Sequence, residues 1–156
     1  MSNKQEDILV LLITNESKIE QLYKMFMTEF TSHQTLWSRL AAKKRYQVES
    51  LKDLSLRLDC HKLFKMHEYS SRILNYVGDF IDEQINRLKQ GKIFLHDALI
   101  VTLRLEQSLK ENNSWAALEP KHEDVSRFFK RLNYQTEQHV NLLFKVCDRV
   151  PACQIG

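Results

Sequence analysis

The sequence predicts an all-α protein, from its composition and from the spacing of its apolar residues. Only three Gly and two Pro interrupt 156 residues that are rich in Leu, Lys, Glu and Gln, a composition that favours long helices. Apolar side chains recur in steps of three and four along several stretches, as on one face of a helix. A chain of this length is large enough to bury a hydrophobic core without stabilisation by disulfide bonds. We expect one helical domain over residues 1–150 and a flexible tail over 151–156.

Two long helices are expected in the first third of the chain. Asn3 and Glu6 have the form of a capping signal, so the first helix should run from about residue 4 to 31, and a polar break over 31–35 should separate it from the second. The first inward stripe is Leu12, Ile19, Tyr23, Phe26 and Phe30, with Glu16 in its middle. The second is Trp37, Leu40, Lys44, Gln47, Leu51, Leu54 and Leu58.

Three more helices follow a connection over residues 59–68. The third should end at Gly91, a favourable residue for a left-handed cap; the fourth should span 95–112, and Pro151 should end the last. In the third helix the inward positions are Ile73, Val77, Phe80, Ile81, Gln84, Ile85 and Leu88. In the fourth they are Leu99, Thr102, Leu105, Glu106 and Leu109. In the last they are Val125, Phe128, Leu132, Thr136, His139, Leu143 and Val146. Two antiparallel pairs joined by a crossover would accommodate these five helices.

The inward polar residues repeat a plan in the two halves of the chain. Each half pairs a helix carrying one inward Glu with a helix carrying two inward polar positions three residues apart. A di-metal bundle has this arrangement, with one Glu from each of two helices and a Glu-x-x-His motif from each of the other two.

Four segments in this order resemble the rubrerythrin-like branch of the ferritin-like superfamily, over nearly the whole chain. They are ESKIEQLY (16–23), LAAKKRYQVESL (40–51), RLKQGKIFLHDALIVTLRLEQSL (87–109) and RLNYQTEQHVNLL (131–143). The resemblance implies an antiparallel four-helix bundle with an extra helix in the crossover connection. It also implies which positions would hold the di-iron ligands.

Three of the six implied ligands remain and three are replaced. The remaining ones are Glu16, Glu106 and His139; the replaced positions hold Lys44, Gln47 and Thr136. Peroxide reduction and iron oxidation in this family need two metals held by bridging carboxylates, so we expect no catalytic residues and no cofactor. The four-cysteine iron site of full rubrerythrins cannot form either, because the chain has three scattered cysteines.

Lys44 is expected to replace the missing metal charge. Two buried carboxylates without a metal would repel one another, and an ammonium among Glu16, Glu106 and His139 would compensate them. Gln47 and Thr136 should then satisfy the same polar network. An alternative is that Lys44 extends outward to solvent along its apolar stem.

Further alternatives concern single residues of this group. Glu16 could stay near the helix surface beside Asn15 and Glu20. His139 could be a hydrogen-bonded core histidine without any ligand role.

The predicted function is a non-catalytic structural or protein-interaction role, with a homodimer or a protein partner. The alternative is a residual metalloprotein in which Glu16, Glu106 and His139 hold one iron, manganese or zinc ion, for an oxidoreductase or metal-storage role. A protonated Lys44 would oppose that ion.

Other features are weaker signals. Exposed aromatics such as Trp115, Phe94 or Tyr69 could recognise a partner. The connection could bind a metal through Cys60, His61, His67 and Glu68, although their spacing is not diagnostic. His96 beside Asp97 is expected to be a helix-start pair.

Charge and hydropathy bear on partners and location. A net charge of +3 from 23 basic and 20 acidic residues is too mild to predict nucleic-acid binding. The apolar run over residues 8–13 is too short for a membrane span or a signal core. The cysteines are odd in number and have no close paired spacing, which suits a reducing cytoplasm. We therefore expect a cytoplasmic location without membrane attachment.

Overall fold

The computed structural model describes residues 4–57, 68–111 and 123–149, and these ranges are almost entirely helical. The elements are α1 (Lys4–Glu29), the 3-10 turn η1 (Thr31–His33), α2 (Gln34–Arg57), α3 (Glu68–Lys89), α4 (Leu95–Glu111) and α5 (Glu123–Asp148). No strand occurs in the described ranges. The predicted all-α class is confirmed.

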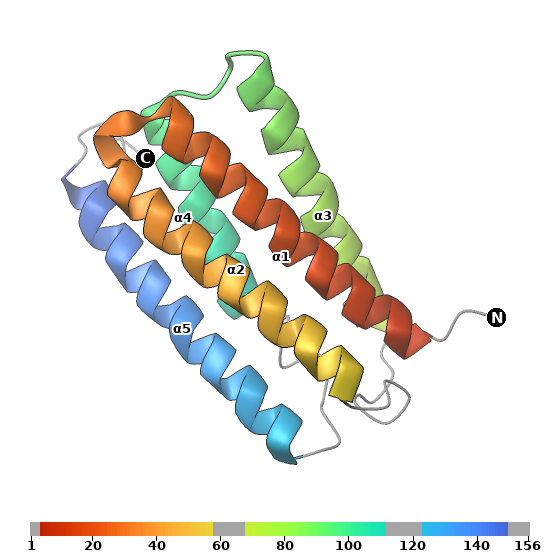
Figure 1. Ribbon diagram of the computed structural model, residues 1–156. Helices are drawn as coiled ribbons and strands as arrows, with labels where there is room; N and C mark the ends of the chain where they lie inside the picture. The colour runs from red at the N-terminus through yellow and green to blue at the C-terminus, as the bar shows by residue number, and fades with distance from the viewer. Residues whose placement is uncertain (1–3, 58–67, 112–122, 150–156) are drawn as a thin grey trace.

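The helices lie side by side and reverse direction from one to the next (Figure 1). The α1 and α2 helices form one antiparallel hairpin, and α4 and α5 form another. The α3 helix comes between these two pairs in the sequence. In space it packs along α1. Because α1 contacts both α2 and α3, it is covered on two sides.

The corner between α1 and α2 lies close to its predicted place. The α1 helix ends at Glu29, two residues before the predicted end, and η1 occupies most of the polar break. The Trp37 ring lies 5.4 Å from the Phe26 ring and 5.8 Å from the Phe30 ring, measured between centroids. Such tilted aromatic pairs hold the end of α1 against the start of α2.

The turn between α3 and α4 has a glycine cap at its predicted position. Gly91 has a positive φ of 71°, which an L side chain rarely adopts. The Lys92 N–H donates to the Arg87 carbonyl at 3.0 Å, closing the last turn of α3. The α4 helix then begins where Asp97 accepts the Phe94 N–H at 2.9 Å, a contact that satisfies a donor at the helix start.

Most of the predicted inward residues are buried. The core combines them with further apolar residues, including Leu22, Val48 and Ala98. The partly buried members of the predicted stripes are Phe30, Ile73, Phe80, Leu88 and Val146. The side chains of Leu58, Leu109, Val125 and Phe128 lie outside the described part of the structure.

The contact between α1 and α3 is close and partly polar. Asn15 donates from Nδ2 to the Leu74 carbonyl at 2.8 Å. A Cβ at Gly78 would lie 2.8 Å from Asn15 Oδ1, so glycine allows this close approach. Asn15 is only 4% exposed, which corrects the alternative that it marks a surface-facing side of α1, because α3 covers that side.

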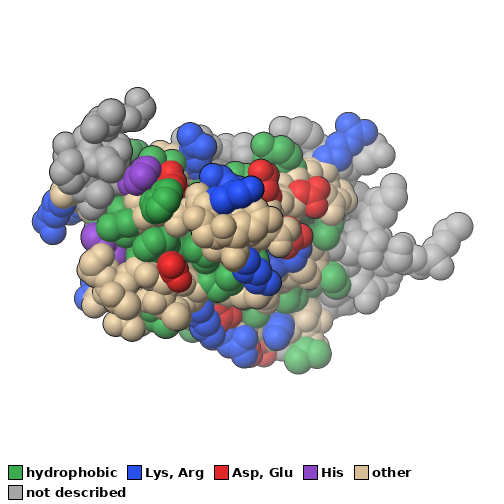
Figure 2. All heavy atoms as spheres, turned by 90° about the horizontal axis from the view of Figure 1, so that it is seen from above, with side chains coloured by type: hydrophobic (Ala, Val, Ile, Leu, Met, Phe, Trp, Pro, Cys, Tyr) green, Lys and Arg blue, Asp and Glu red, His purple; other side chains and the backbone are tan. Residues whose placement is uncertain are grey.

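The surface of the described residues mixes charges and apolar groups. Figure 2 shows Lys and Arg interspersed with Asp and Glu on the face seen from above. None of the helices in the described ranges is both long enough and apolar enough to span a bilayer. The predicted tail over 151–156, Trp115, and the side chains of the candidate metal group in the connection lie outside the described residues.

Candidate functional site

A cluster of polar side chains is buried in the interior, contributed by α1, α2, α4 and α5. Its members are the six residues singled out in the sequence: Glu16, Lys44, Gln47, Glu106, Thr136 and His139. Each is at most 2% exposed. They are inside because each occupies an apolar-stripe position of its helix, so the alternative of a surface-facing Glu16 is wrong.

Lys44 lies between two carboxylates that come from different helices. Its Nζ is 3.2 Å from Glu16 Oε2 and 3.4 Å from Glu106 Oε1. The Lys44 side chain is completely buried, so it does not extend outward to solvent. A single ammonium therefore links α1 and α4 to α2.

Glu106 is the most highly coordinated member of the cluster. Tyr23 donates its hydroxyl to Glu106 Oε1 at 2.7 Å, and His139 Nδ1 lies 3.2 Å from Glu106 Oε2. With Lys44 beside Oε1, groups from three helices meet at this one carboxylate. This contact agrees with the alternative prediction, in which His139 is a hydrogen-bonded histidine of the core.

Tyr23 is a site residue that the sequence predicts as part of the apolar stripe and of the segment 16–23 in the family resemblance, but not as a member of the polar cluster. It follows Glu16 by seven residues, a spacing that puts both side chains on one face of a helix. The phenol therefore reaches the same interior space as the Glu16 carboxylate, while its ring packs in the core. This spacing was the signal that could have added Tyr23 to the predicted set.

The two carboxyl groups have opposite pKa shifts. Burial by itself would raise the pKa of Glu106, but the Lys44 charge, helped by His139 and Tyr23, lowers that pKa to about 2. Burial raises the pKa of Glu16 above 4.5, and the nearby Glu106 charge adds to the rise although Lys44 opposes it. Glu106 thus keeps its negative charge more firmly than Glu16 does.

Lys44 and Tyr23, two of the partners of Glu106, also have altered pKa values. Burial alone would lower the pKa of Lys44, but the charges of Glu106 and Glu16 raise it above 10.5. Burial raises the pKa of the Tyr23 phenol well above 10.0, and the Glu106 charge adds to the rise. Lys44 is therefore an ammonium and Tyr23 a neutral donor at neutral pH.

Gln47 and Thr136 do not join the network around Lys44 as predicted. Gln47 donates from Nε2 to Gln135 Oε1 at 3.1 Å, and Thr136 donates to the Leu132 carbonyl at 3.0 Å. A threonine inside a helix can bond the carbonyl one turn back without any other partner. The prediction that both residues form hydrogen bonds within the Lys44 network is therefore wrong.

Four buried atoms of the cluster form no hydrogen bond with other described groups. They are Glu16 Oε2, Lys44 Nζ, Gln47 Oε1 and His139 Nε2. The contacts of Lys44 are thus ion pairs by distance, without hydrogen-bond geometry. A buried charge held in this way depends strongly on its partners, because unpaired charges are costly in a low-dielectric interior.

The donor set does not fit the pair of metals that the resemblance implies. An ammonium lies within 3.4 Å of an oxygen from each remaining carboxylate, and it would repel a divalent ion there. The Thr136 hydroxyl is engaged with a main-chain carbonyl. Among the described residues, no three His, Cys, Asp or Glu side chains are grouped as a metal site requires.

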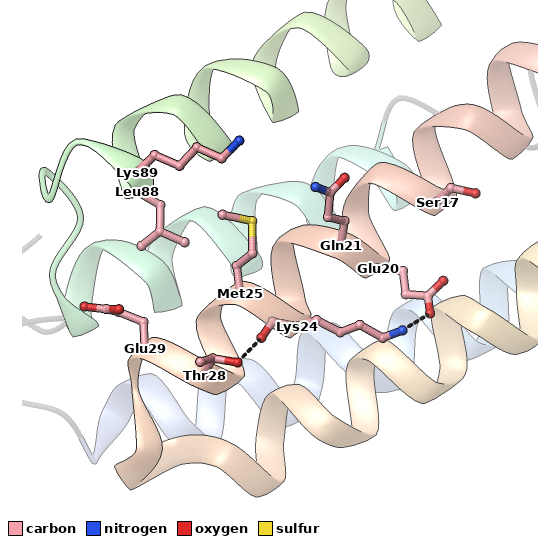
Figure 3. A pocket seen from close by; sticks show the side chains of 9 residues that line it. All are labelled: Ser17, Glu20, Gln21, Lys24, Met25, Thr28, Glu29, Leu88 and Lys89. Atoms are coloured by element: carbon pink, nitrogen blue, oxygen red, sulfur yellow. Dashed lines mark hydrogen bonds and ion pairs between the residues drawn. The ribbon is translucent and has the colours of Figure 1, made fainter.

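A hollow of about 670 Å³ lies elsewhere, beside α1 and the end of α3 (Figure 3). At its edge Glu20 pairs with Lys24 at 2.9 Å. Glu20 is 5% exposed, which corrects its expected surface position. A second contact of Glu20, with the Arg45 guanidinium at 3.8 Å, is longer, so Glu20 and Lys24 at this hollow already have charged partners.

Comparison of the chain with protein-family models, curated proteins and solved structures finds no match. The family resemblance therefore stays a prediction, and the site is described by its own contacts.

Proposed function

We propose that this protein is a non-catalytic ferritin-like helical bundle in which Lys44 takes the place of the di-iron centre. In this proposal α1, α2, α4 and α5 form the four-helix bundle and α3 is the helical crossover. The observation that carries the proposal is the Lys44 ammonium, 3.2 Å from Glu16 and 3.4 Å from Glu106. The order and directions of the helices support the bundle (Figure 1).

The chemistry of the cluster supports a structural rather than a catalytic role. Lys44 compensates the Glu106 charge, and its raised pKa makes it a poor nucleophile or base. The Tyr23 phenol likewise holds its proton firmly. A cluster of this kind specifies how four helices pack, as buried polar groups do in some other proteins.

A protein-interaction role draws support from exposed aromatic side chains. Tyr76 on α3 is 74% exposed, and Phe94 before α4 is 64% exposed. Aromatic side chains are enriched at protein interfaces. In this proposal the partner is a second copy of the chain or another protein, and neither nucleic acid nor a membrane is involved.

The second candidate is a residual metalloprotein. It is favoured by the presence of Glu16, Glu106 and His139 in one cluster, with His139 Nδ1 3.2 Å from Glu106 Oε2. One iron, manganese or zinc ion held there would serve an oxidoreductase or metal-storage role. That ion would have to displace Lys44 from between the carboxylates.

Elemental analysis distinguishes the two candidates. The protein is purified from cells supplied with iron, manganese and zinc, and metal per chain is measured for the native protein, His139→Ala and His96→Ala. We expect far less than one metal per chain in all three. About one equivalent in the native protein and in His96→Ala, lost in His139→Ala, would overturn the proposal.

A second arm of this experiment restores the implied ligands. The triple variant Lys44→Glu, Gln47→His and Thr136→Glu returns the six-ligand pattern of a di-metal bundle. We expect it to take up metal, whereas the double variant that keeps Lys44 should not. Circular dichroism of both variants checks that the helices are retained.

A further inference from the structure

An apolar groove lies between α3 and α4. Its volume is about 230 Å³, and its lining residues are Tyr76, Val77, Phe80, Arg104 and Leu105. Val77 and Leu105 are 4% and 1% exposed, whereas Tyr76 and Arg104 are exposed. The described part of α3 packs mainly along α1, so the side of α3 beside this groove is open to a partner.

The exposed face of α3 next to the groove carries a cation, an aromatic ring and an anion in order. Arg72, Tyr76 and Asp79 are all exposed, and their spacing of four and three residues puts them on one face of the helix. Within the described ranges, Arg72 and Asp79 form no ion pair. Tyr76 is 74% exposed, more than any other aromatic side chain among the described residues.

This order of charges is complementary to itself when two copies of the helix run antiparallel. Residues at equal distances on either side of a two-fold axis then face one another across an isologous interface. An axis at the level between residues 75 and 76 brings Arg72 of each copy opposite Asp79 of the other. A parallel pair would instead bring Arg72 opposite Arg72 and Asp79 opposite Asp79, which is repulsive.

We propose that this face of α3, formed by Arg72, Tyr76 and Asp79, binds the same face of a second copy of the chain in an antiparallel pair. The inference rests on the interaction role in the proposed function, and it names the partner and the surface. Two symmetric Arg72–Asp79 ion pairs flank the two Tyr76 rings, which lie at the axis.

The groove accounts for the position of the tyrosine. Side chains of a helix point toward its N-terminus, so in the antiparallel pair each Tyr76 leans toward Phe80 of the other copy. Phe80 is half-buried and lines the groove of that copy. The ring therefore covers apolar surface that α3 and α4 leave open, and a buried aromatic anchor of this kind is typical of protein interfaces.

Sedimentation velocity of the full chain over a concentration series up to about 0.1 mM tests the pairing. We expect a monomer–dimer equilibrium and no larger species, because an isologous interface is closed. Tyr76→Ala should weaken the dimer about tenfold or more. Tyr46→Ala removes another exposed tyrosine, from α2, and should leave the dimer unchanged.

Charge reversal tests the antiparallel register directly. Arg72→Asp and Asp79→Arg each put like charges at both symmetric contacts, so each variant alone should dimerise at least about tenfold more weakly. An equimolar mixture of the two variants should dimerise as well as the native protein, because one copy then carries both anions and the other both cations. Circular dichroism checks that both variants remain helical.

Matched controls separate the register from a general effect of charge. Lys130→Asp on α5 and Glu29→Arg on α1 make similar charge changes at exposed positions. Each control variant should dimerise like the native protein, both alone and when the two are mixed.

Four results would overturn the proposal. They are a native protein that stays monomeric, association into species larger than a dimer, charge-reversed variants that dimerise like the native protein, and a mixture of those variants that stays monomeric. Metal content is measured separately. A monomer without metal would overturn this interface and leave the non-catalytic bundle, whereas a dimer that contains metal would do the reverse.

Discussion

Lys43 and Lys44 are neighbours in the sequence with opposite environments. Successive residues of a helix point about 100° apart, so one lysine is exposed while the other is fully buried. The buried one is tolerated because two carboxylates face it. Side-chain identity alone would place both lysines on the surface; position within the apolar stripe separates them.

Lys44→Met should destabilise the protein strongly, by about 3 to 5 kcal/mol, because it leaves the buried Glu106 charge without its ammonium partner. Chemical denaturation followed by circular dichroism measures the free energy of unfolding. Lys43→Met is the matched control, and its exposed position should limit the change to about 0.5 kcal/mol. Similar small losses in both variants would contradict the role assigned to the Lys44 ion pairs.

At the scale of the element, α1 buries more residues than its one predicted apolar stripe contains. Its predicted stripe does not include Asn15 and Leu22, which flank it on the helix and are also buried. The reason is that α3 packs along α1 and Asn15 bonds the Leu74 carbonyl. The end of α3 was easier to predict, because Gly91 has no Cβ and so adopts the left-handed conformation of a helix cap without steric strain.

Gly91→Ala should destabilise the protein by about 1 kcal/mol, since an L side chain at a φ of 71° is strained. No atom lies within 4 Å of the added Cβ, so backbone conformation is the cause tested. Thermal or chemical unfolding measures the loss. Gln90→Ala is the adjacent control, and Gly91→Asn should cost less than Gly91→Ala. An unchanged or increased stability in Gly91→Ala would contradict the left-handed cap.

At the scale of the whole molecule, the cluster connects helices that are distant in the sequence. Glu16 on α1, Lys44 on α2, Glu106 on α4 and His139 on α5 form a chain of contacts of 3.2 to 3.4 Å. The α3 helix is joined to this assembly mainly through α1. Stability of the whole fold should therefore depend on the ionisation of the buried carboxyls.

Glu106 should make the protein less stable as the pH falls from about 4.5 toward 2. Its pKa is about 2 in the folded protein against an ordinary 4.5, so over this range the unfolded chain binds a proton that the folded chain does not. The contribution is fully present above 4.5, and its slope is at most about 1.4 kcal/mol per pH unit. Denaturation of the native protein and of Glu106→Gln at several pH values measures it.

The stability difference between the native protein and Glu106→Gln should therefore shrink as the pH falls below 4.5. Glu83→Gln, at an exposed position on α3, should show no such change. Glu16 acts in the opposite sense, because its raised pKa favours the folded state as the pH falls toward 4.5. A difference for Glu106→Gln that does not vary with pH would contradict the low pKa.

Much of the helical layout was predictable, and so were the members of the cluster. Helical periodicity is a local property, so the stripes identified Glu16, Lys44, Glu106 and His139 as inward-facing residues. Hydrogen-bond partners are different, because they depend on which helices become neighbours and at what depth. Gln47 was therefore assigned to the wrong network, and Tyr23 was left out of the right one.

The sequence by itself determined an all-α chain and a set of polar residues that must share its interior, since composition and periodicity act within each helix. Only the tertiary structure decided that Lys44 lies between Glu16 and Glu106 and that His139 bonds Glu106 through Nδ1. The physical reason is that these distances join residues from different helices, and packing between helices sets their values.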